Sequence, residues 1–497
     1  MTNTIDTDFD PATVQHYISV VVNKIQVLMQ KVDVISQHDY TSASPLALSG
    51  VLIRMLSRFL DYLRSWSEKA DYQPPADVIR TVYTINHIVV SIIPQLIDAI
   101  EGADIDVPIA SIIEAYEDIV NQVQYGVQAI IHPTWEYNAS SSEVMQYLRE
   151  VTSSLSQEAS KAIFSGAPHY FVIITYPKAE EQIVLRQALI AHEVGHFIDK
   201  SIKKWSASLL EQQLLNPKDI ENITVQLNGE KHVSELQIKI MHTIDQMVTL
   251  WIDEIVSDFL AISIIGPAYL FAFDEISFSP KYSPPQKLSL SHPPDQLRKA
   301  IMGKWVSEMY ITPVRRSRGT AKFSKDEREV LESVIKRVEV VSRGDNDSFI
   351  SIGNSSQLPK NVLAPIYLTL KHAMETAASI LWEQKYKTIE NEQWICKKED
   401  IIDAIELQDL LINGLIPTEL YVVPSRYPSF AAMMNSGWFH LIKCESSYLY
   451  FSRKDEHVSN PDQITARYII LQNLIAKGIE SLHFMREYVR RKGTQHG

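Results

Sequence analysis

The stretch LIAHEVGHFIDK, residues 189–200, places two histidines four residues apart, with a glutamate directly after the first. Apolar residues recur around them with a helical period, so we predict a helix with this stretch in its middle. Residues i and i+4 share one helix face, with Cβ atoms about 5–6 Å apart. His192 and His196 could therefore both direct a ring nitrogen at one Zn²⁺ ion. The alternative is an ordinary amphipathic helix that carries two imidazoles.

Two neighbours of the histidines bear on this choice. Glu193 would lie beside the metal position without binding it, where a carboxylate can accept a proton from water, as in the H-E-x-x-H motif. Gly195 stands inside the helix, where glycine costs up to about 1 kcal/mol relative to alanine. We therefore expect another part of the chain to pack closely against the backbone at Gly195.

A catalytic zinc ion usually has three protein ligands and one open position, so a third ligand must come from elsewhere. In WIDEIVSDFLA, Glu254 and Asp258 stand four residues apart in an apolar setting, where a carboxylate needs a metal or a hydrogen-bond donor. Glu254 is the candidate third ligand, and Asp258 could hold a ligand histidine through its other ring nitrogen. Asp253, Asp258 or His242 could be the ligand instead, or Glu254 could be half of an exposed ion pair.

An H-E-x-x-H sequence on one helix, followed by E-x-x-x-D on a later helix, resembles the gluzincin class, the thermolysin-like zinc metallopeptidases. The resemblance implies a zinc ion bound by His192, His196 and Glu254. It also implies that Glu193 is the general base and that Asp258 supports His192. It covers about 130 residues and leaves the flanking thirds of the chain unassigned.

The segment SHPPDQLRKAI is similar to a short His-Pro segment, followed by an arginine, that some integral-membrane gluzincins carry after the third ligand. His292 or Arg298 could therefore stabilise the oxyanion of a tetrahedral intermediate or support the site structurally, and Tyr282 is a further candidate for the oxyanion. Those relatives span membranes. We expect no membrane span in this chain, so their substrate class does not carry over.

The fold class that we predict is mainly α: a helical N-terminal bundle, a zincin-like α+β catalytic core with a small sheet, and a mostly helical C-terminal region. Helical periodicity through PIASIIEAYEDIVNQVQYGVQAII predicts an all-helical bundle over residues 1–165. HYFVIITYP, residues 169–177, is a strand candidate. It could be an edge strand that pairs with a bound peptide, or a sheet strand with no role in substrate binding. A helix should begin directly after it, near Glu180.

The predicted core covers residues 166–312. A long helix from Ser234 would carry the third ligand, and a proline-rich loop would lead to a helix over residues 295–310. FLAISIIGPAYLFAF is the longest apolar run, but it is shorter than the ~20 residues of a membrane span and is broken by Gly266 and Pro267. It therefore predicts a buried helix-turn-helix.

The last part of the chain divides into a helical region, residues 313–405, and an α+β region, residues 406–497. ELYVVPSRYP and FHLIKCESSYLYFS suggest strands in the second of these, because both are rich in aromatic and β-branched residues. The stretch that begins DQITARYIILQNL then predicts a final helix.

The composition, net charge and cysteine content of the chain exclude some classes of function. The chain of 497 residues is 45% hydrophobic and 22% charged, which is typical of globular proteins. A formal net charge of −13 argues against nucleic acid as the main partner. The only cysteines, Cys396 and Cys444, offer neither a disulfide framework nor a cysteine-based zinc site. The N-terminus has no secretory pattern, so we expect a cytoplasmic protein.

We therefore expect a soluble intracellular zinc-dependent endopeptidase with a protein or peptide substrate, and a regulatory partner could bind its N-terminal bundle. The alternative is a helical interaction or regulatory protein whose zinc site is structural or inactive. A fourth protein ligand, such as His242 or Asp253, would support that alternative. A zinc hydrolase that acts on a non-peptide bond is a third reading.

Overall fold

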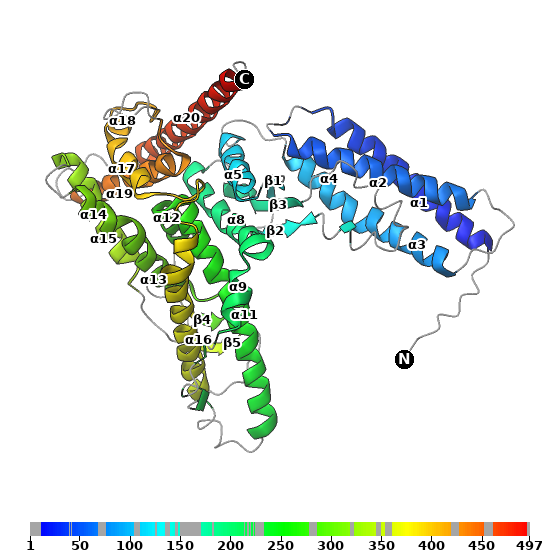
Figure 1. The fold of residues 1–497 in the computed structure, drawn as a ribbon, viewed down its shortest axis with the longest axis horizontal. Coiled ribbons are helices and arrows are strands. Elements are labelled where there is room, and N and C mark those ends of the chain that lie inside the picture. Colours follow the sequence, from blue (N-terminus) through cyan, green and yellow to red (C-terminus); the bar gives the residue numbers. More distant parts are fainter. Residues whose placement is uncertain are drawn as a thin grey trace. The chain divides into compact units, whose positions relative to one another are not determined.

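The structure of this chain is a computed structural model. It describes residues 11–38, 40, 42–67, 76–103, 110–124, 127–134, 140–144, 148–149, 170–180, 183–212, 214–215, 218, 220–221, 223, 233–277, 286–318, 323–343, 349–352, 360–418, 427–451 and 461–494. The chain forms two compact units, Met1–Ala179 and Glu180–Gly497, where the sequence suggested four segments. Helices predominate in both units (Figure 1), so the prediction of a mainly α fold is confirmed.

The first unit begins with a helical bundle around one apolar core. Val21, Ile25 and Phe59 lie at the centre of this core and are fully or almost fully buried. They recur on one face of each helix because an amphipathic helix packs its apolar stripe inward. The helices are α1 (Pro11–Ile35), α2 (Ser44–Ser67), α3 (Ala76–His87), a π-helical turn (Ile88–Ile92), α4 (Ile93–Gly102) and α5 (Ala110–Val123).

A sheet completes the first unit. β1 (Val127–Thr134) runs parallel to β3 (Tyr170–Pro177), and β2 (Ser140–Glu143) pairs antiparallel with β3 on its other side. The prediction of an all-helical region up to residue 165 is therefore wrong at β1 and β2. In β1 the apolar residues are nearly continuous, and such a short run fits a buried strand as well as a helix.

β3 confirms the strand predicted over residues 169–177, although residue 169 itself lies outside the described residues. Its place as the middle strand contradicts the edge-strand interpretation, because β1 and β2 already occupy both of its edges. β3 also belongs to the first unit, whereas we had assigned it to the catalytic core. β3 therefore has no free edge at which to pair with a bound peptide.

The second unit contains the HEVGH stretch. Two short 3₁₀ turns precede it, η3 (Lys178–Glu180) and η4 (Val184–Leu189). The sequence predicted one continuous α-helix in their place. The elements that follow are α8 (Ile190–Ile198), η5 (Asp199–Lys203), α9 (Trp205–Leu210), α11 (Val233–Ile265), α12 (Pro267–Ile276), β4 (Gln286–Leu288), α13 (Asp295–Val306), η6 (Ser307–Ile311), α14 (Thr312–Arg318), α15 (Lys325–Val341), β5 (Phe349–Ile352), α16 (Lys360–Ile380), η7 (Leu381–Lys385), η8 (Tyr386–Thr388), α17 (Lys398–Glu406), α18 (Gln408–Ile412), α19 (Phe430–Phe451) and α20 (Pro461–Thr494). Among the described residues, β4 and β5 form the small sheet of this unit, a parallel pair.

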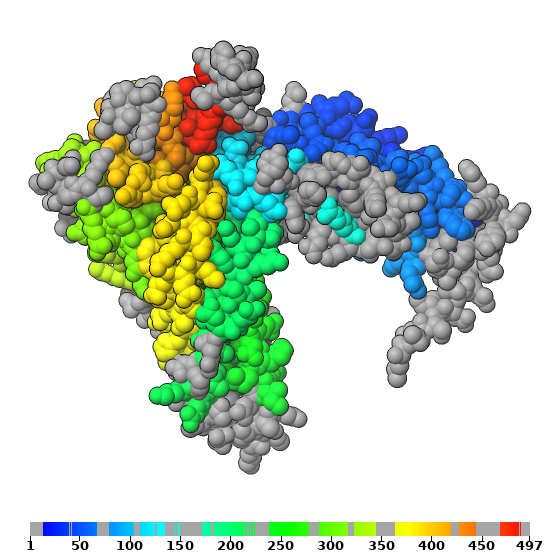
Figure 2. Space-filling view, viewed as in Figure 1, coloured from blue at the N-terminus to red at the C-terminus, as the bar shows by residue number. Residues whose placement is uncertain are grey.

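Helix α11 is the central element of the second unit and confirms the long helix predicted from Ser234. It packs against α8, α9, α12, α13, α16 and α19. The green surface of α11 lies beside the yellow surface of α16 in the space-filling view (Figure 2). Trp251 and Phe259 of α11 are completely buried. The helix thus places its middle turns, which carry the candidate third ligand, inside the apolar core.

The predicted buried helix-turn-helix is confirmed. Gly266 joins α11 to α12 with φ 71°, a conformation that favours glycine, and Pro267 begins α12. A Cβ atom at Gly266 would lie 2.8 Å from Cys396 Sγ. Asn435 closes the turn from α19: its amide donates to Ile265 O and accepts from the backbone N–H of α12, both at 2.8 Å.

One strand prediction near the C-terminus is wrong, because FHLIKCESSYLYFS lies in helix α19. The buried face of α19 extends all round the helix near Phe439, and a helix that is apolar on every side loses the period by which it is recognised. The other expected strand, ELYVVPSRYP, lies mostly outside the described residues. The final predicted helix is α20.

One described helical stretch, Ile79–Gly102, is long and apolar enough to cross a membrane by length and composition alone. Half of it is buried within the first unit, as in the core helix of a soluble protein. Its buried side chains contribute to the same core cluster as α1 and α2. The stretch is therefore accounted for as a core element of the helical bundle.

Candidate metal centre

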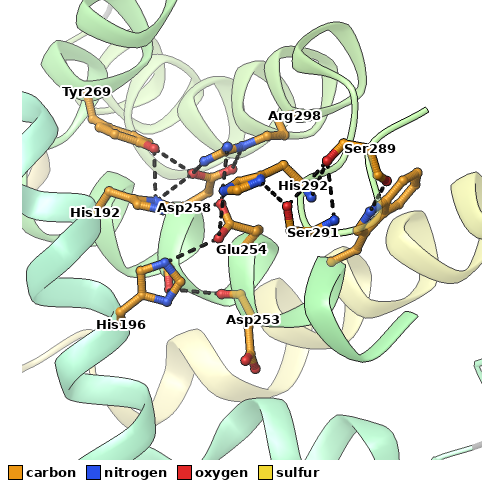
Figure 3. Close-up of polar contacts among 12 residues, drawn as sticks. His192, His196, Asp253, Glu254, Asp258, Tyr269, Ser289, Ser291, His292 and Arg298 are labelled. Carbon is orange, nitrogen blue, oxygen red and sulfur yellow. Dashed lines mark hydrogen bonds and ion pairs between the residues drawn. The ribbon is translucent and has the colours of Figure 1, made fainter. Parts of the chain in front are cut away.

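Helices α8 and α11 bring together two imidazoles and a carboxylate (Figure 3). One ligand atom from each of His192, His196 and Glu254 lies within 4.8 Å of the others. His192 Nε2 is 3.4 Å from Glu254 Oε2, and His196 Nε2 is 3.4 Å from Glu254 Oε1. Both Nε2 atoms therefore face the same carboxylate, and the three residues could hold a metal ion.

Gly195 allows α8 to approach α11 this closely. A Cβ atom at this position would lie 2.7 Å from the backbone oxygen of Ser257 and 3.3 Å from Cβ of Leu260. The expectation that another segment packs against the backbone at Gly195 is thus confirmed, and the segment is α11. Without a side chain at this position, the two helices can place His192 and His196 on one side of Glu254.

Asp258 orients His192 through the ring nitrogen that does not face Glu254. Its Oδ1 atom is 3.0 Å from His192 Nδ1. The Asp258 side chain is completely buried, and Arg298 donates to it from Nε at 2.7 Å and from Nη2 at 2.6 Å. Tyr269 also donates its hydroxyl to Oδ1, at 2.5 Å. This set of contacts favours a proton on His192 Nδ1, so Nε2 is the atom that could bind a metal ion, in place of its own proton.

The charges around Asp258 explain why its carboxyl group is ionised. Burial alone would raise the pKa of its carboxyl, but the charge and hydrogen bonds of Arg298, with His192, lower the pKa to about 2. Asp258 is therefore an anion at neutral pH. For His192, burial would lower the pKa, but the carboxylates of Asp258 and Glu254 outweigh it and raise the pKa to about 10. The pocket thus favours positive charge at the position of His192.

Ser257 orients His196 in a similar way. The Ser257 hydroxyl donates its one proton to the backbone oxygen of Asp253, at 2.8 Å. Ser257 Oγ also lies 2.7 Å from His196 Nδ1. Because that hydroxyl proton is already committed, His196 Nδ1–H must be the donor in this second contact. The Nε2 lone pair of His196 is therefore free to face Glu254 and a metal.

The carboxylate of Glu254 is incompletely satisfied by hydrogen bonds, which fits a group that could hold a cation. Its Oε2 atom is buried and has no hydrogen bond of good geometry among the described residues, although Arg298 Nη1 lies 3.2 Å away. Burial raises the pKa of this carboxyl, but His192, His196 and Arg298 together hold the pKa far below its usual range. This buried anionic oxygen has ion pairs but no hydrogen bond of good geometry, and a metal ion would satisfy it more completely.

Glu193 is buried on α8, next to His192, with 6% of its surface exposed. Its carboxylate makes no hydrogen bond or ion pair with another described residue. Buried carboxylates are usually paired. An unpaired one beside a candidate metal ligand, His192, is available to accept a proton from water. The role of general base stays a prediction.

Arg298 and His292, the two candidates for the oxyanion, occupy different environments. All three terminal nitrogens of Arg298 contact Asp258 or Glu254, and its guanidinium also lies 4.5 Å from the centre of the Phe273 ring. This arrangement favours the structural role that the sequence left open for Arg298. The His292 side chain is 57% exposed, with Nε2 3.6 Å from Glu254 Oε1 and Nδ1 2.7 Å from Ser291 Oγ. Tyr282 lies outside the described residues.

The alternative ligands do not join the cluster. His242 is exposed on an early turn of α11. The carboxylate of Asp253 points away from the imidazoles in Figure 3, and its backbone oxygen, rather than its side chain, contacts Ser257. Within the described part of the chain, the group that could hold a metal ion therefore consists of three residues, fewer than the four protein ligands of a closed structural zinc site.

Sequence reasoning missed Tyr269 and Ser257. Ser257 could have been noticed, because it lies directly before Asp258 on the helix that carries the third ligand. Tyr269 gives no such signal, since it reaches Asp258 only because the turn at Gly266 folds α12 back toward α11. Comparison with known proteins adds nothing to this geometry: no family model, curated protein or solved structure matches the chain.

Proposed function

We propose that the chain is a soluble, cytoplasmic, zinc-dependent endopeptidase whose metal ligands are His192, His196 and Glu254. The observation that carries the proposal is the convergence of these three side chains around a buried carboxylate oxygen that lacks a hydrogen bond. Orientation of both imidazoles by partners on α11 is the arrangement that metal-ligating histidines need. The resemblance to gluzincins supports the same ligand set.

Zinc suits this donor set better than the other abundant divalent cations. Magnesium and calcium prefer all-oxygen ligands, whereas two imidazoles and one carboxylate are typical of catalytic zinc sites. A bound zinc ion would supply Lewis-acid chemistry, which polarises a carbonyl group and lowers the pKa of water toward neutrality.

The protein's own residues would perform the proton transfers and the positioning. Glu193 would accept a proton from the attacking water and pass it to the leaving amine. His292, exposed at the edge of the cluster, would donate a hydrogen bond to the developing oxyanion. Arg298 and Asp258 would hold the ligands in place without touching the substrate.

Cleavage of a peptide library, followed by mass spectrometry, tests the proposal. We expect zinc-loaded wild-type protein to cleave a subset of peptides. Glu193→Gln should retain zinc but cleave at least about 100-fold more slowly, because general acid-base catalysis contributes 10²–10⁴-fold. Glu211→Gln, a change at an exposed glutamate after α9, is the matched control and should cleave at the wild-type rate. Undiminished cleavage by Glu193→Gln, or no cleavage by any zinc-loaded variant, would contradict the proposal.

A further inference from the structure

A cavity lies in the second unit, and none of its lining residues is a proposed metal ligand. Its volume is about 600 Å³, within the range of small-molecule sites. Helices α13 and α16, which pack against each other (Figure 1), form its walls together with the π-helical turns that follow them, η6 and η7. The residues that matter below are Ile301, Trp305 and Glu308 on one wall, and Glu375, Ala378 and Trp382 on the other.

The cavity has an apolar floor and a polar rim. Ile301 and Trp305 form the buried floor, and Trp305 is held in place by a hydrogen bond from Nε1 to Ala378 O, at 3.3 Å. Lys304 and Glu375 are exposed at the rim. An apolar floor with a few polar groups is the usual composition of a ligand site, in which the floor contributes affinity and the polar groups choose the ligand.

Glu308 carries the main chemical signal. Its Oε2 atom is buried and has no hydrogen-bond partner among the described residues. Lys304 lies one helical turn away, yet no ion pair joins it to Glu308 in the described part of the chain. A buried carboxylate oxygen without a donor is unfavourable, and Glu308 is one of the residues that line the cavity, so a ligand that brings a donor to this carboxylate would stabilise it.

Two irregular helical turns at this cavity support the interpretation that it binds a ligand. Glu308 lies in the π-helical turn Ser307–Ile311, and Trp382 lies in the π-helical turn Leu381–Lys385. π-Helical turns are rare and occur frequently at functional sites. Here one such turn from each wall supplies a side chain to the same cavity. The face of a tryptophan ring attracts cations, and a carboxylate pairs with them.

We propose that this cavity binds a small organic amine, with its ammonium group at Glu308 and its alkyl chain along Ile301, Trp305 and Trp382. The two carboxylates of Glu308 and Glu375 outnumber the one ammonium group of Lys304 and so disfavour an anion, and the apolar floor disfavours a bare metal ion. The ammonium could belong to a free aliphatic amine or to a lysine side chain. This site is independent of the proposed peptidase activity, because none of its lining residues is a proposed metal ligand.

Isothermal titration calorimetry with hexylamine tests the site directly. We expect hexylamine to bind with a stoichiometry near one and 1-hexanol, its neutral counterpart, to bind at least tenfold more weakly. Glu308→Gln should weaken hexylamine at least tenfold. Trp382→Leu should weaken it several-fold by removing the aromatic face. Glu383→Gln, an exposed neighbour that does not line the cavity, is the control and should bind hexylamine as the wild type does.

Equal affinity for hexylamine and 1-hexanol would overturn the proposal, as would unchanged binding by Glu308→Gln or no binding at millimolar amine. Circular dichroism of each variant shows whether a loss of binding comes from unfolding. A parallel titration with Nα-acetyl-lysine amide separates the two sources of the ammonium group. Tighter binding than hexylamine assigns the cavity to a lysine side chain, and weaker binding assigns it to a free amine.

Discussion

Replacement of Gly195 by alanine should separate the two helices that carry the metal ligands. The new Cβ atom would lie 2.7 Å from Ser257 O and 3.1 Å from Ser257 Cα, whereas an ordinary contact begins near 3.4 Å. The backbones of α8 and α11 must therefore move apart by about 0.7 Å at this point. Metal sites tolerate distance errors of only about 0.2 Å, so His196 and Glu254 could no longer bind one ion with ideal geometry.

The free-energy balance favours destabilisation. Alanine gains up to about 1 kcal/mol over glycine through helix propensity. Overpacking against a backbone atom, which cannot rotate away as a side chain can, costs about 1–3 kcal/mol. We therefore expect Gly195→Ala to lower the free energy of unfolding by up to about 2 kcal/mol. The affinity for zinc should fall at least tenfold.

Gly50→Ala is the matched control. Gly50 also lies inside a helix, α2, but a Cβ atom there meets only the flexible end of Arg54, at 3.5 Å. This substitution should stabilise the protein by about 0.5–1 kcal/mol without changing zinc affinity. Thermal unfolding and competition with a zinc chelator measure both quantities. Wild-type zinc affinity together with raised stability in Gly195→Ala would refute the reasoning, because the close approach of α8 to α11 would then have no consequence.

Three further predictions concern single side chains. Ser257→Ala removes the acceptor for His196 Nδ1–H, so zinc affinity should fall about 10–100-fold while the melting temperature changes little. Competition with a chelator measures the zinc affinity. Unchanged affinity would contradict the orientation assigned to His196. Arg298→Met leaves the buried Asp258 carboxylate without its guanidinium partner and should lower the free energy of unfolding by about 3–5 kcal/mol. Urea unfolding measures this difference. An effect below about 1 kcal/mol would show that this ion pair adds little to stability. Burial raises the pKa of Glu117 to about 8. The folded state therefore binds a proton more tightly than the unfolded state, and stability should fall as pH rises from about 4.5 to 8, by up to about 5 kcal/mol. Glu117→Gln should abolish that loss in a series of unfolding curves, and an unchanged pH dependence would contradict the assignment to Glu117.

The clustering of His192, His196 and Glu254 could be anticipated because much of its signal is local. His192 and His196 share a helix turn, and the long apolar helix around Glu254 made two buried carboxylates conspicuous. Helical periodicity also predicted α11, the turn at Gly266 and α12. These features depend on spacing within one element, which sequence patterns record directly.

Features that depend on contacts between distant elements could not be anticipated. The apolar run of β1 is short and continuous, so it fits a helix as well as a strand, and its pairing with β3 is what makes it a strand. Burial on all sides of α19 hides its helical period, so its sequence resembles that of a strand in part. Tyr269 reaches Asp258 only in the folded chain. Arg298 was placed near the site by resemblance, but its carboxylate partners emerged from the packing of α13 on α11.

Zinc content, measured by elemental analysis of purified protein, tests the metal centre most directly. We predict close to one zinc ion per chain in the wild type and in Asp253→Asn, whose side chain points away from the cluster. His196→Ala and Glu254→Ala should lose zinc, because each removes one of three ligands. Absence of zinc from the wild type after reconstitution, or equal zinc content in all four proteins, would contradict a zinc site at His192, His196 and Glu254.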